Sequence, residues 1–369
     1  MRIVVHREIR EDPDLLRRWN ALALQMEVPA VFYTCEWALA VQSAYQTSLK
    51  PLLVLGYEGD ELTGVACLGT DPAERGVTFL TATTGDYCDF LSHPGLRHQF
   101  VGAVLSEIGK MKVSGLALAN IPAESATPAA LSAAAGEYGF HIYTRPAYLC
   151  AQIDLGAGEI RHALRNTLQN KKKFRRYVRE LEREGPVTFV HLQSWEELRT
   201  ALPRFADAHV ARFETTHRVS SLTTSERRHF IEDLARRFAD TGVVTLSLMM
   251  VSDQPVAWNY GFQYCGSWFW YQPTFDSRYE ESSPGHCLLS RIVIEACDMS
   301  TMRLVDLGLG AEGYKERFAN NTRQTLHATL TKSSLRHLRE VARYRIATAV
   351  KRSSKLEAVI RSVRSRLRS

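Results

Sequence analysis

Hydrophobic and polar positions follow two periods along the first 155 residues, one of about two residues and one of about 3.6 residues. Runs of strand-like composition predict strands at residues 3–6, 51–57, 61–68, 77–81, 114–119 and 141–154. Apolar residues at helical spacing predict helices at residues 13–26, 34–45, 95–111 and 128–138. Thr34 is suited to the N-cap of the second helix because its hydroxyl can accept a hydrogen bond from a free backbone N–H.

The same order of elements returns after residue 186. Strands are predicted at residues 187–192, 243–251, 256–264, 267–272, 302–307 and 325–331. Helices are predicted at residues 194–212, 225–241, 284–298 and 313–319. A single α+β domain with antiparallel hairpins would give a partly similar order, but two matching passes favour a duplication. We therefore expect an α+β fold in α/β layers, with two tandem domains at residues 1–155 and 156–332. Each would hold a mixed, mostly antiparallel sheet flanked by helices.

A long basic helix is predicted between the two halves, from Glu159 to Glu184. Its apolar residues form a stripe in which Lys171 fills a gap. In one interpretation the helix is a solvated charged element, and the stem of Lys171 packs along its apolar face. In the other, Arg165 and Lys171 point into a cleft between the domains and hold an anionic ligand.

The composition is that of a soluble globular protein. Of 369 residues, 45% are hydrophobic and 23% are charged, and no apolar run approaches the 18 or so residues that a spanning helix requires. The first ten residues carry charges, which is untypical of a signal peptide. The seven cysteines are widely spaced and form no CxxC pair, so neither a disulfide framework nor a zinc site is indicated. We expect a cytoplasmic protein without a metal.

Positive charge gathers at the C-terminal end of the chain. Residues 331–369 hold 12 Lys or Arg against Glu340 and Glu357, a local net charge of +10, so the rest of the chain carries −4 of the total +6. Apolar residues are scattered among these bases. The segment 333–369 could be a basic amphipathic helix on an anionic membrane surface, a disordered solubilising tail, or an arm that binds RNA.

An aromatic strand leads into a capped helix at residues 268–289. Ser283 is suited to the N-cap of that helix, Pro284 to its first position, and Gly285 leaves the first turn uncrowded. Free N–H groups and the helix dipole make such a turn a site for an anion. The alternative is an ordinary helix start, because these three residues are common ones.

A second block raises the case for a ligand site. The predicted strand at 302–307 ends in Asp306-Leu307-Gly308-Leu309-Gly310, and Tyr314-Lys315 follows on a short helix. Junctions between sheet and helix of this kind often line ligand sites. Lys315 would stabilise a developing oxyanion with its fixed charge, unless it is simply a surface residue.

Together these blocks resemble the double-domain branch of the GNAT superfamily. That branch includes acetyltransferases of cellulose and exopolysaccharide biosynthesis and, more distantly, the Fem-type aminoacyl ligases of peptidoglycan assembly. The resemblance covers the chain from Arg165 to Phe318 and is weaker in the first half, at 32–37 and 85–89. The matching pieces are the basic helix at 165–183, the hairpin 251–264, Phe275-Asp276-Ser277-Arg278-Tyr279, Ser283-Pro284-Gly285, Asp306 to Gly310, and Tyr314-Lys315.

The resemblance implies two GNAT-like domains with a cleft for the acceptor between them. It also implies an acyl donor, usually acetyl-CoA, bound against the central strands of the second domain. Lys315, Tyr314 and Asp306 are the implied catalytic residues. Donor-binding positions are Ser283, Pro284, Gly285, Tyr271, Gly308 and Gly310. The superfamily's usual pyrophosphate loop, Q/R-x-x-G-x-G/A, is absent before Pro284, where the shorter Ser283-Pro284-Gly285 stands instead.

The acceptor is expected to be an amine, on an amino sugar or a cell-envelope precursor. Because only an unprotonated amine attacks a thioester, a base is expected nearby. Substrate-binding candidates, several of which can also act as a base, are Asp86, Asp89, Arg165, Lys171, His209, Glu214 and Asp276. For each of them an ordinary polar or capping role is the alternative.

Three functions remain open on the sequence alone. The first is an acyl-CoA-dependent N-acyltransferase for an envelope or exopolysaccharide precursor. The second keeps the fold but takes its acyl group from aminoacyl-tRNA, whose phosphates would meet the basic helix and the basic tail. The third is a GNAT-derived scaffold without catalysis, recruited to polysaccharide synthesis at the inner face of the membrane.

Overall fold

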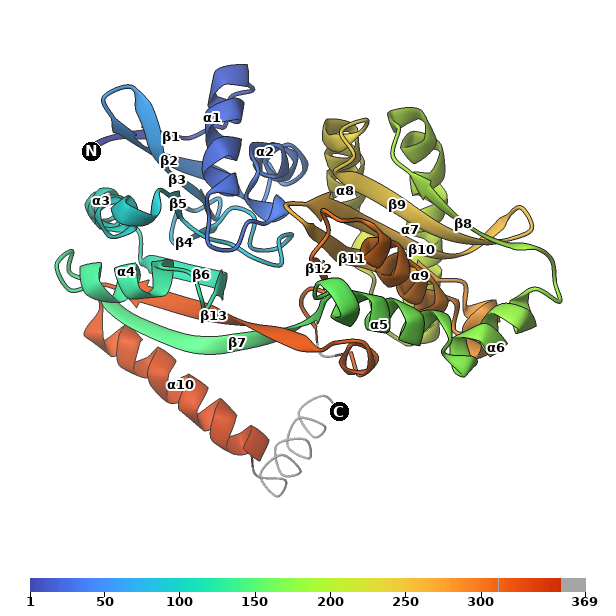
Figure 1. Ribbon diagram of the computed structural model, residues 1–369. Coiled ribbons are helices and arrows are strands. Elements are labelled where there is room, and N and C mark those ends of the chain that lie inside the picture. The colour runs from blue at the N-terminus through green and yellow to red at the C-terminus, as the bar shows by residue number, and fades with distance from the viewer. Residues whose placement is uncertain (311, 353–369) are drawn as a thin grey trace.

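The computed structural model describes residues 1–310 and 312–352, except for the side chains of 347 and 349–352, and shows two α/β halves side by side (Figure 1). Its strands are β1 (Arg2–His6), β2 (Lys50–Glu58), β3 (Glu61–Thr70), β4 (Val77–Phe79), β5 (Leu91–Ser92), β6 (Gly115–Pro122), β7 (His141–Asp154), β8 (Val187–Leu192), β9 (Val244–Val251), β10 (Gln254–Tyr264), β11 (Ser267–Phe275), β12 (Leu304–Asp306) and β13 (Asn321–Thr331). They form one sheet in the order β1-β2-β3-β4-β6-β13-β7-β12-β11-β10-β9-β8, with β5 beside β3.

Helices cover this sheet in a doubled order. They are α1 (Pro13–Leu24), α2 (Cys35–Ala44), α3 (Arg97–Lys110), α4 (Thr127–Ala134), α5 (Gly158–Gln169), α6 (Lys172–Leu181), α7 (Trp195–Thr215), α8 (Ser225–Phe238), α9 (Pro284–Asp298) and α10 (Ser334–Arg352). Apart from the two-residue β5, the order β-α-α-β-β-β-α-β runs from β1 to β6 and again from β8 to β12, so the predicted fold class is confirmed. Within the described residues, no helix is both long and apolar enough to cross a membrane.

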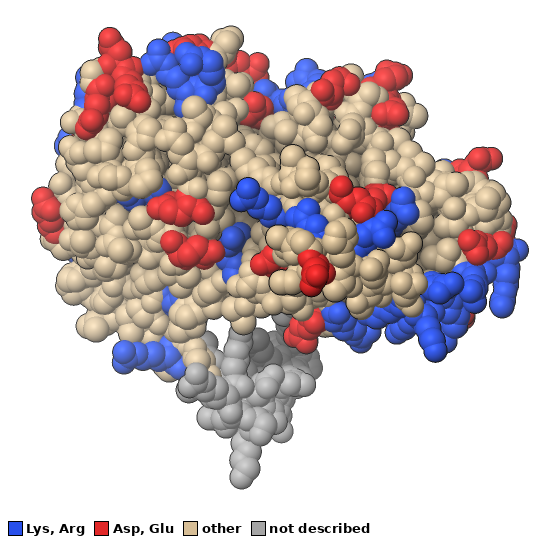
Figure 2. Space-filling model, in the orientation of Figure 1, with Lys and Arg blue, Asp and Glu red and all other residues tan. Residues whose placement is uncertain are grey.

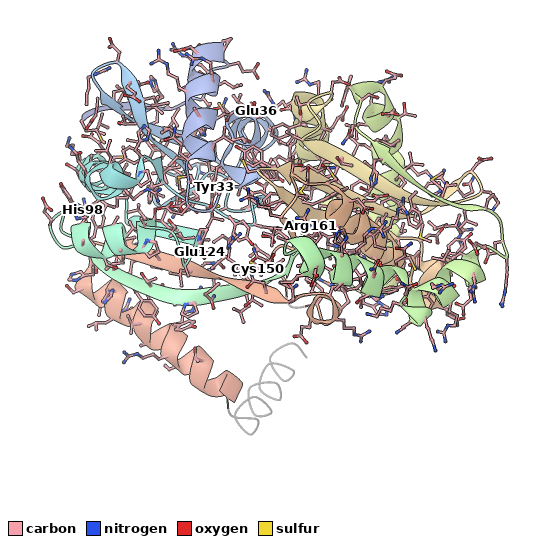
Figure 3. All side chains as sticks on the ribbon, viewed as in Figure 1. Tyr33, Glu36, His98, Glu124, Cys150 and Arg161 are labelled. Atoms are coloured by element: carbon pink, nitrogen blue, oxygen red, sulfur yellow. The ribbon has the colours of Figure 1, made fainter. Side chains whose placement is uncertain are left out.

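The two halves exchange strands at the middle of the sheet. Strand β13, from the end of the second half, lies between β6 and β7 of the first half. Strand β7 in turn reaches the second half, where Gln152–Asp154 pairs with β12. Glu124, labelled in Figure 3, lies just past β6 in the first half. Arg323 of β13 pairs with it at 2.5 Å. The predicted boundary at residue 155 therefore does not divide the hydrogen-bonded sheet.

The cores of the two halves also merge through aromatic side chains. Phe32, from the turn before α2, lies 5.3 Å from Phe269 of β11 between ring centroids. Trp37 of α2 lies 5.2 Å from Phe262 of β10 and 5.5 Å from Phe230 of α8. All of these residues are buried, so the interface packs like a protein interior.

Two predicted helices differ from the structure. The helix expected at 159–184 is divided into α5 and α6, because Lys171 has an extended backbone (φ −64°, ψ 107°) that ends one helix and begins the next. The helix expected at 313–319 is one 3-10 turn, η5 (Lys315–Arg317). The tail is helical to Arg352, and the expectations for 353–369 lie outside the described residues.

Candidate active site

A pocket of about 610 Å³ opens between the two halves of the molecule. The first half contributes Tyr45 and residues 82–86, from the loop after β4. The second half contributes the end of α7, the start of α8, the middle of β11 and residues of the loop 307–315. A pocket of this size accommodates a small-molecule substrate.

Strand β11 supplies one wall because its parallel neighbour β12 is short. The two strands pair only over Ser267–Phe269 and Leu304–Asp306, whereas β11 continues to Phe275. A bulge opposite Gly261 interrupts the pairing of β11 with β10 at the point where Trp270 and Tyr271 enter the pocket. Bulges of this kind re-aim side chains next to functional sites.

Asp86 reaches from the first half to the backbone turn that follows β12. A Cβ built on Gly308 would lie 2.3 Å from Asp86 Oδ2, so the carboxylate rests directly on this glycine. Burial, aided by the negative charge of Asp306 and opposed by Lys315, raises the pKa of Asp86 to about 7. Part of its surface still faces the pocket. At neutral pH this carboxylate can therefore accept a proton.

Lys315 lies beside Asp86 on the η5 turn, with only 6% of its side chain exposed. Its Nζ donates to the backbone oxygen of Leu309 at 2.7 Å and pairs with Glu312 at 2.9 Å. Two of its three N–H donors are thus occupied, which leaves one for a ligand. Tyr314 accepts a hydrogen bond from Trp270 Nε1 at 3.1 Å, and burial raises the pKa of its hydroxyl to about 12.

Asp306 is fully buried and lies outside the pocket lining. Its carboxylate accepts hydrogen bonds from Tyr87 Oη, Gln152 Nε2 and the backbone N–H of Gly308, each at 2.8 Å. The structure therefore places Asp306 as a positioning residue that fixes the Gly308 turn, rather than against the substrate as its predicted catalytic role required.

A second hollow, of about 320 Å³, adjoins the first and shares Arg212, Trp270, Pro273 and Tyr314 with it. It extends to the first turn of α9, where Ser283, Gly285 and His286 line it. Two ligands could thus meet at the shared residues, one from the cleft between the halves and one from the start of α9.

The start of α9 differs in detail from the prediction. Pro284 occupies the first helical position, as predicted, but Ser283 adopts a left-handed backbone (φ 46°, ψ 52°) and its side chain caps no N–H group. Burial lowers the pKa of His286 in the first turn, and so do nearby positive charges. Those charges belong to Arg317, Lys173, Arg212 and Lys171. The turn thus lies in a positive field that favours an anion.

Of the remaining predicted site residues, some line the pocket and others lie away from it. Tyr271 and His209 line the pocket; burial lowers the pKa of His209 to about 4, so this histidine is neutral at pH 7. Gly308 and Gly310 both have positive φ angles, +68° and +115°, which the turn requires. Asp89, expected on the cleft, is instead buried in the first half beside Arg97 at 3.6 Å.

Four further candidates also lie outside both hollows. Arg165 pairs with Asp298 on α9 at 2.6 Å, and Lys171 lies over the Phe174 ring at 4.9 Å. Glu214 is exposed at the end of α7, and Asp276 is bound by Arg278 at 2.6 Å. In the described part of the chain no group of three or more His, Cys, Asp or Glu is placed to hold a metal ion.

Three arginines that sequence reasoning missed line the pocket, namely Arg212, Arg218 and Arg227. Arg227 is on the first turn of α8 and Arg212 near the end of α7. Nothing in their sequence context distinguishes them from the many surface arginines of the chain, because only the packing of α7 and α8 against β11 brings them to one cavity.

Comparison with known proteins agrees with this architecture. Residues 169–316 match the family model described as an acetyltransferase (GNAT) domain. The chain is similar in structure to FemX, with a TM-score of 0.61 and 10% identity over 89% of this chain and 97% of that one. It is also similar to L-PGS from Bacillus licheniformis, with a TM-score of 0.51 and 13% identity over 90% and 96% of the two chains.

A third similar structure is the C-terminal domain of a protein from Agrobacterium fabrum named as a lysylphosphatidylglycerol synthetase. Its TM-score is 0.54, with 12% identity over 91% of this chain and 96% of that one. No curated protein matches the sequence. Residues 169–316 are therefore similar to a GNAT acetyltransferase domain, and the whole chain shares the fold of these solved structures.

Proposed function

We propose that this protein is an acyl-CoA-dependent N-acyltransferase that transfers an acetyl or related acyl group to an amine. The observation that carries the proposal is the meeting of two hollows at Trp270 and Tyr314, with Asp86 and Lys315 beside them. One hollow begins at a helix start in a positive field, which suits a phosphate-bearing donor. The other lies between the halves and suits an acceptor.

The chemistry assigned to these residues is direct transfer. The amine nitrogen attacks the thioester carbon, an N–C bond forms, and the C–S bond breaks to release the thiolate of CoA, which takes up a proton from water. Asp86 accepts the proton that the nitrogen loses, and its raised pKa matches that task at neutral pH. The free N–H of Lys315 and unpaired backbone N–H groups on the open edge of β11 stabilise the oxyanion.

The donor end of the site lacks the usual pyrophosphate loop. In our proposal the first turn of α9 receives the phosphates together with Lys171, Lys173 and Arg317, the cations that surround His286. Lys171 would thus contact the donor rather than the acceptor. The acceptor would be an amino sugar or another amine of a cell-envelope or exopolysaccharide precursor, bound between the halves.

Calorimetric titration with acetyl-CoA, followed by assay of CoA release with a panel of amino-sugar nucleotides, tests this function. We expect acetyl-CoA to bind and Lys173→Gln to weaken the binding, whereas the matched variant Lys110→Gln, exposed on α3, should not. If neither acetyl-CoA nor a longer acyl-CoA binds to the protein, the proposal fails.

A second candidate, aminoacyl transfer from tRNA, is favoured by the surface of α6. Lys172, Lys173, Arg175, Arg176 and Arg179 are all exposed there, and Figure 2 shows a concentration of positive side chains where α6 lies in Figure 1. Tyr177 of the same helix adjoins Ser283 at the start of α9. A strand of RNA along α6 would reach the donor hollow.

The similarity to FemX and to L-PGS adds weight to this alternative only at the level of fold. A gel shift with aminoacylated tRNA over a range of salt concentrations separates the two candidates. A salt-sensitive shift that Arg175→Gln and Arg179→Gln weaken would favour the RNA donor, and no shift at low salt would exclude it.

A further inference from the structure

Arg227 is a buried cation without an acidic partner at the wall of the pocket. Its side chain is 7% exposed, and its Nη2 donates to Tyr271 Oη at 2.7 Å. Its Nε has no hydrogen-bond partner among the described residues, and no carboxylate there lies within ion-pair distance of it. Phe230 and Tyr271 lie against its guanidinium, at 5.0 and 5.6 Å from the ring centroids.

Such an arrangement is costly unless a ligand completes it. A charge removed from water loses its hydration, and a buried donor without a partner adds a further desolvation cost. Aromatic faces recover only part of this. Proteins normally pair buried arginines with carboxylates, so a pocket-lining arginine without one indicates an anionic partner from outside the chain.

Two more arginines reinforce the positive charge of this pocket. Arg218 and Arg212 also line it, and neither has an ion-pair partner in the described part of the chain. They pack on aromatic rings instead, Arg218 on Phe213 at 5.0 Å and Arg212 on Phe275 at 4.2 Å. Of the two acidic lining residues, Glu312 is paired with Lys315. The other, Asp86, is close enough for the charge of Arg227 to lower its pKa, but the two form no ion pair among the described residues, and burial keeps the pKa of Asp86 near 7.

We propose that the acceptor carries an anionic group, a carboxylate or a phosphate, which binds to Arg227 with support from Arg218 and Arg212. This inference rests on the proposed function, in which the amine of the acceptor is directed to Asp86. The anionic group is at the opposite end of the same acceptor molecule. The anion lies on the α7–α8 side of the pocket, and the amine lies on the Gly308 side. A neutral amino sugar would leave Arg227 without a partner, so sugar phosphates and amino-acid-like acceptors fit better.

The test is binding of simple anions while the donor site is filled. Inorganic phosphate and succinate are titrated separately into protein saturated with CoA, and binding is followed by calorimetry and by the rise in Tm. We expect at least one of the two anions to bind. Arg227→Gln and Arg218→Gln should weaken this binding about tenfold or more, as expected for a lost charged hydrogen bond.

Controls keep the outcomes distinct. Arg199→Gln, an exposed arginine on α7 that pairs only with Glu196, should leave anion binding unchanged. If Arg227→Gln fails to fold, Arg227→Lys replaces it, because lysine keeps the buried charge while losing the guanidinium. Arg218 is exposed, so its replacement should not disturb folding. Unchanged binding in both glutamine variants, or none in the wild type, overturns the inference. Failure of CoA itself to bind would instead count against the proposed function, and the titration is then repeated without CoA.

A second inference comes independently from α10, which packs on β7 with one face only. In Figure 1, α10 runs along β7. His337 lies 5.5 Å from His141 and Tyr344 lies 5.9 Å from Tyr143 between ring centroids. Positions 337, 341, 344 and 348 of α10 are half-buried. They are three or four residues apart and so lie on one face of the helix. The opposite face carries Leu335, Leu338 and Ile346, which are 60, 63 and 64% exposed.

We infer that this outer face of α10 docks on an anionic lipid surface. Its apolar residues, with Ala342, stand at 335, 338, 342 and 346, again the spacing of one helical face. Arg336, Arg339, Arg343 and Arg345 are all exposed along the same helix. Apolar residues flanked by arginines suit the boundary between acyl chains and acidic headgroups, whereas binding to RNA would leave the leucines in water.

Vesicle sedimentation of the full chain tests this inference. We expect binding to vesicles of phosphatidylcholine with phosphatidylglycerol, and little binding to phosphatidylcholine alone. Replacing Leu335, Leu338 and Ile346 together by Asn should reduce binding about tenfold or more. Leu24→Asn, at a leucine of α1 that is 53% exposed, should not. The inference is overturned if the triple variant binds acidic vesicles as well as the wild type does. It is also overturned if the protein prefers RNA to acidic vesicles and the triple variant keeps that preference.

Discussion

Opposing influences act on the carboxyl group of Asp86. Burial and the neighbouring Asp306 raise its pKa, whereas Lys315, the backbone N–H of Leu309 and Arg227 lower it, with a result of about 7. If Asp86 is the base, kcat at saturating acceptor should rise with pH and level off above about 7. Asp86→Asn should lower kcat about a hundredfold or more and remove that pH dependence. A pH profile of the variant that keeps its inflection near 7 would assign the base to another group.

The same pKa also affects stability. A carboxyl whose folded pKa lies above its unfolded value of 3.8 binds its proton more tightly in the native state. Its contribution to stability is therefore fully present below pH 3.8 and is lost as the pH rises to about 7. Urea titrations at pH 5.5 to 8, chosen on that basis, should show a decline in the free energy of unfolding that is smaller in Asp86→Asn than in the wild type.

Lys315 offers a second test at the scale of one residue. Its charge is held by the Leu309 carbonyl and Glu312, so its position does not depend on the substrate. Lys315→Met keeps the length of the stem but removes the charge, and we expect kcat to fall about a hundredfold or more with little change in KM. Stopped-flow assays measure this, with Lys110→Met as the control for loss of a surface charge. A change confined to KM would make Lys315 a binding residue instead.

At the scale of the element, the turn after β12 links the buried Asp306 to the pocket. Asp306 accepts a hydrogen bond from Gly308 in this turn, and the carboxylate of Asp86 rests on the same glycine. Gly308 has φ +68°, and a methyl group there would lie 2.3 Å from Asp86 Oδ2. Gly59, in the β2–β3 hairpin, has φ +59° and open space around it. Gly59→Ala should therefore cost only the backbone strain, about 1 kcal/mol, whereas Gly308→Ala should also displace Asp86 and lower kcat. Equal activity of the two variants would show that Asp86 is not set by this turn.

Elements with strong local signals and their doubled order were predicted well, whereas the exchange of strands at the middle of the sheet was not. Strands such as β7 and β8 match their predicted bounds because their composition and turn residues are local properties. The break at Lys171 was missed, since it lies in an otherwise continuous helical pattern. In the site, Lys315 and Asp86 were identified from short motifs. Arg227 was not, because its role depends on the docking of α8 against β11.

At the scale of the whole molecule, the exchanged strands bind the two halves to each other. Strand β13 separates β6 from β7 and places Ala328 and Leu330 in the core of the first half. A fragment of residues 1–155 would lack both the hydrogen bonds and these apolar side chains. We expect that fragment to stay unfolded or to aggregate by circular dichroism and gel filtration, even though its sequence reads as a complete domain.

Restoring the missing strand is the matched control. Residues 1–155 joined through a flexible Gly/Ser linker to residues 321–333 should regain a cooperative thermal transition, because β13 can then return between β6 and β7. The full chain should unfold in a single step when followed by both near- and far-ultraviolet signals, since neither half has a complete sheet alone. Independent folding of residues 1–155, or two separate transitions in the full chain, would mean that the exchange is not essential to the first half. The active site would then lie between two separable domains, and the pocket that contains Asp86 and Arg227 would open without unfolding.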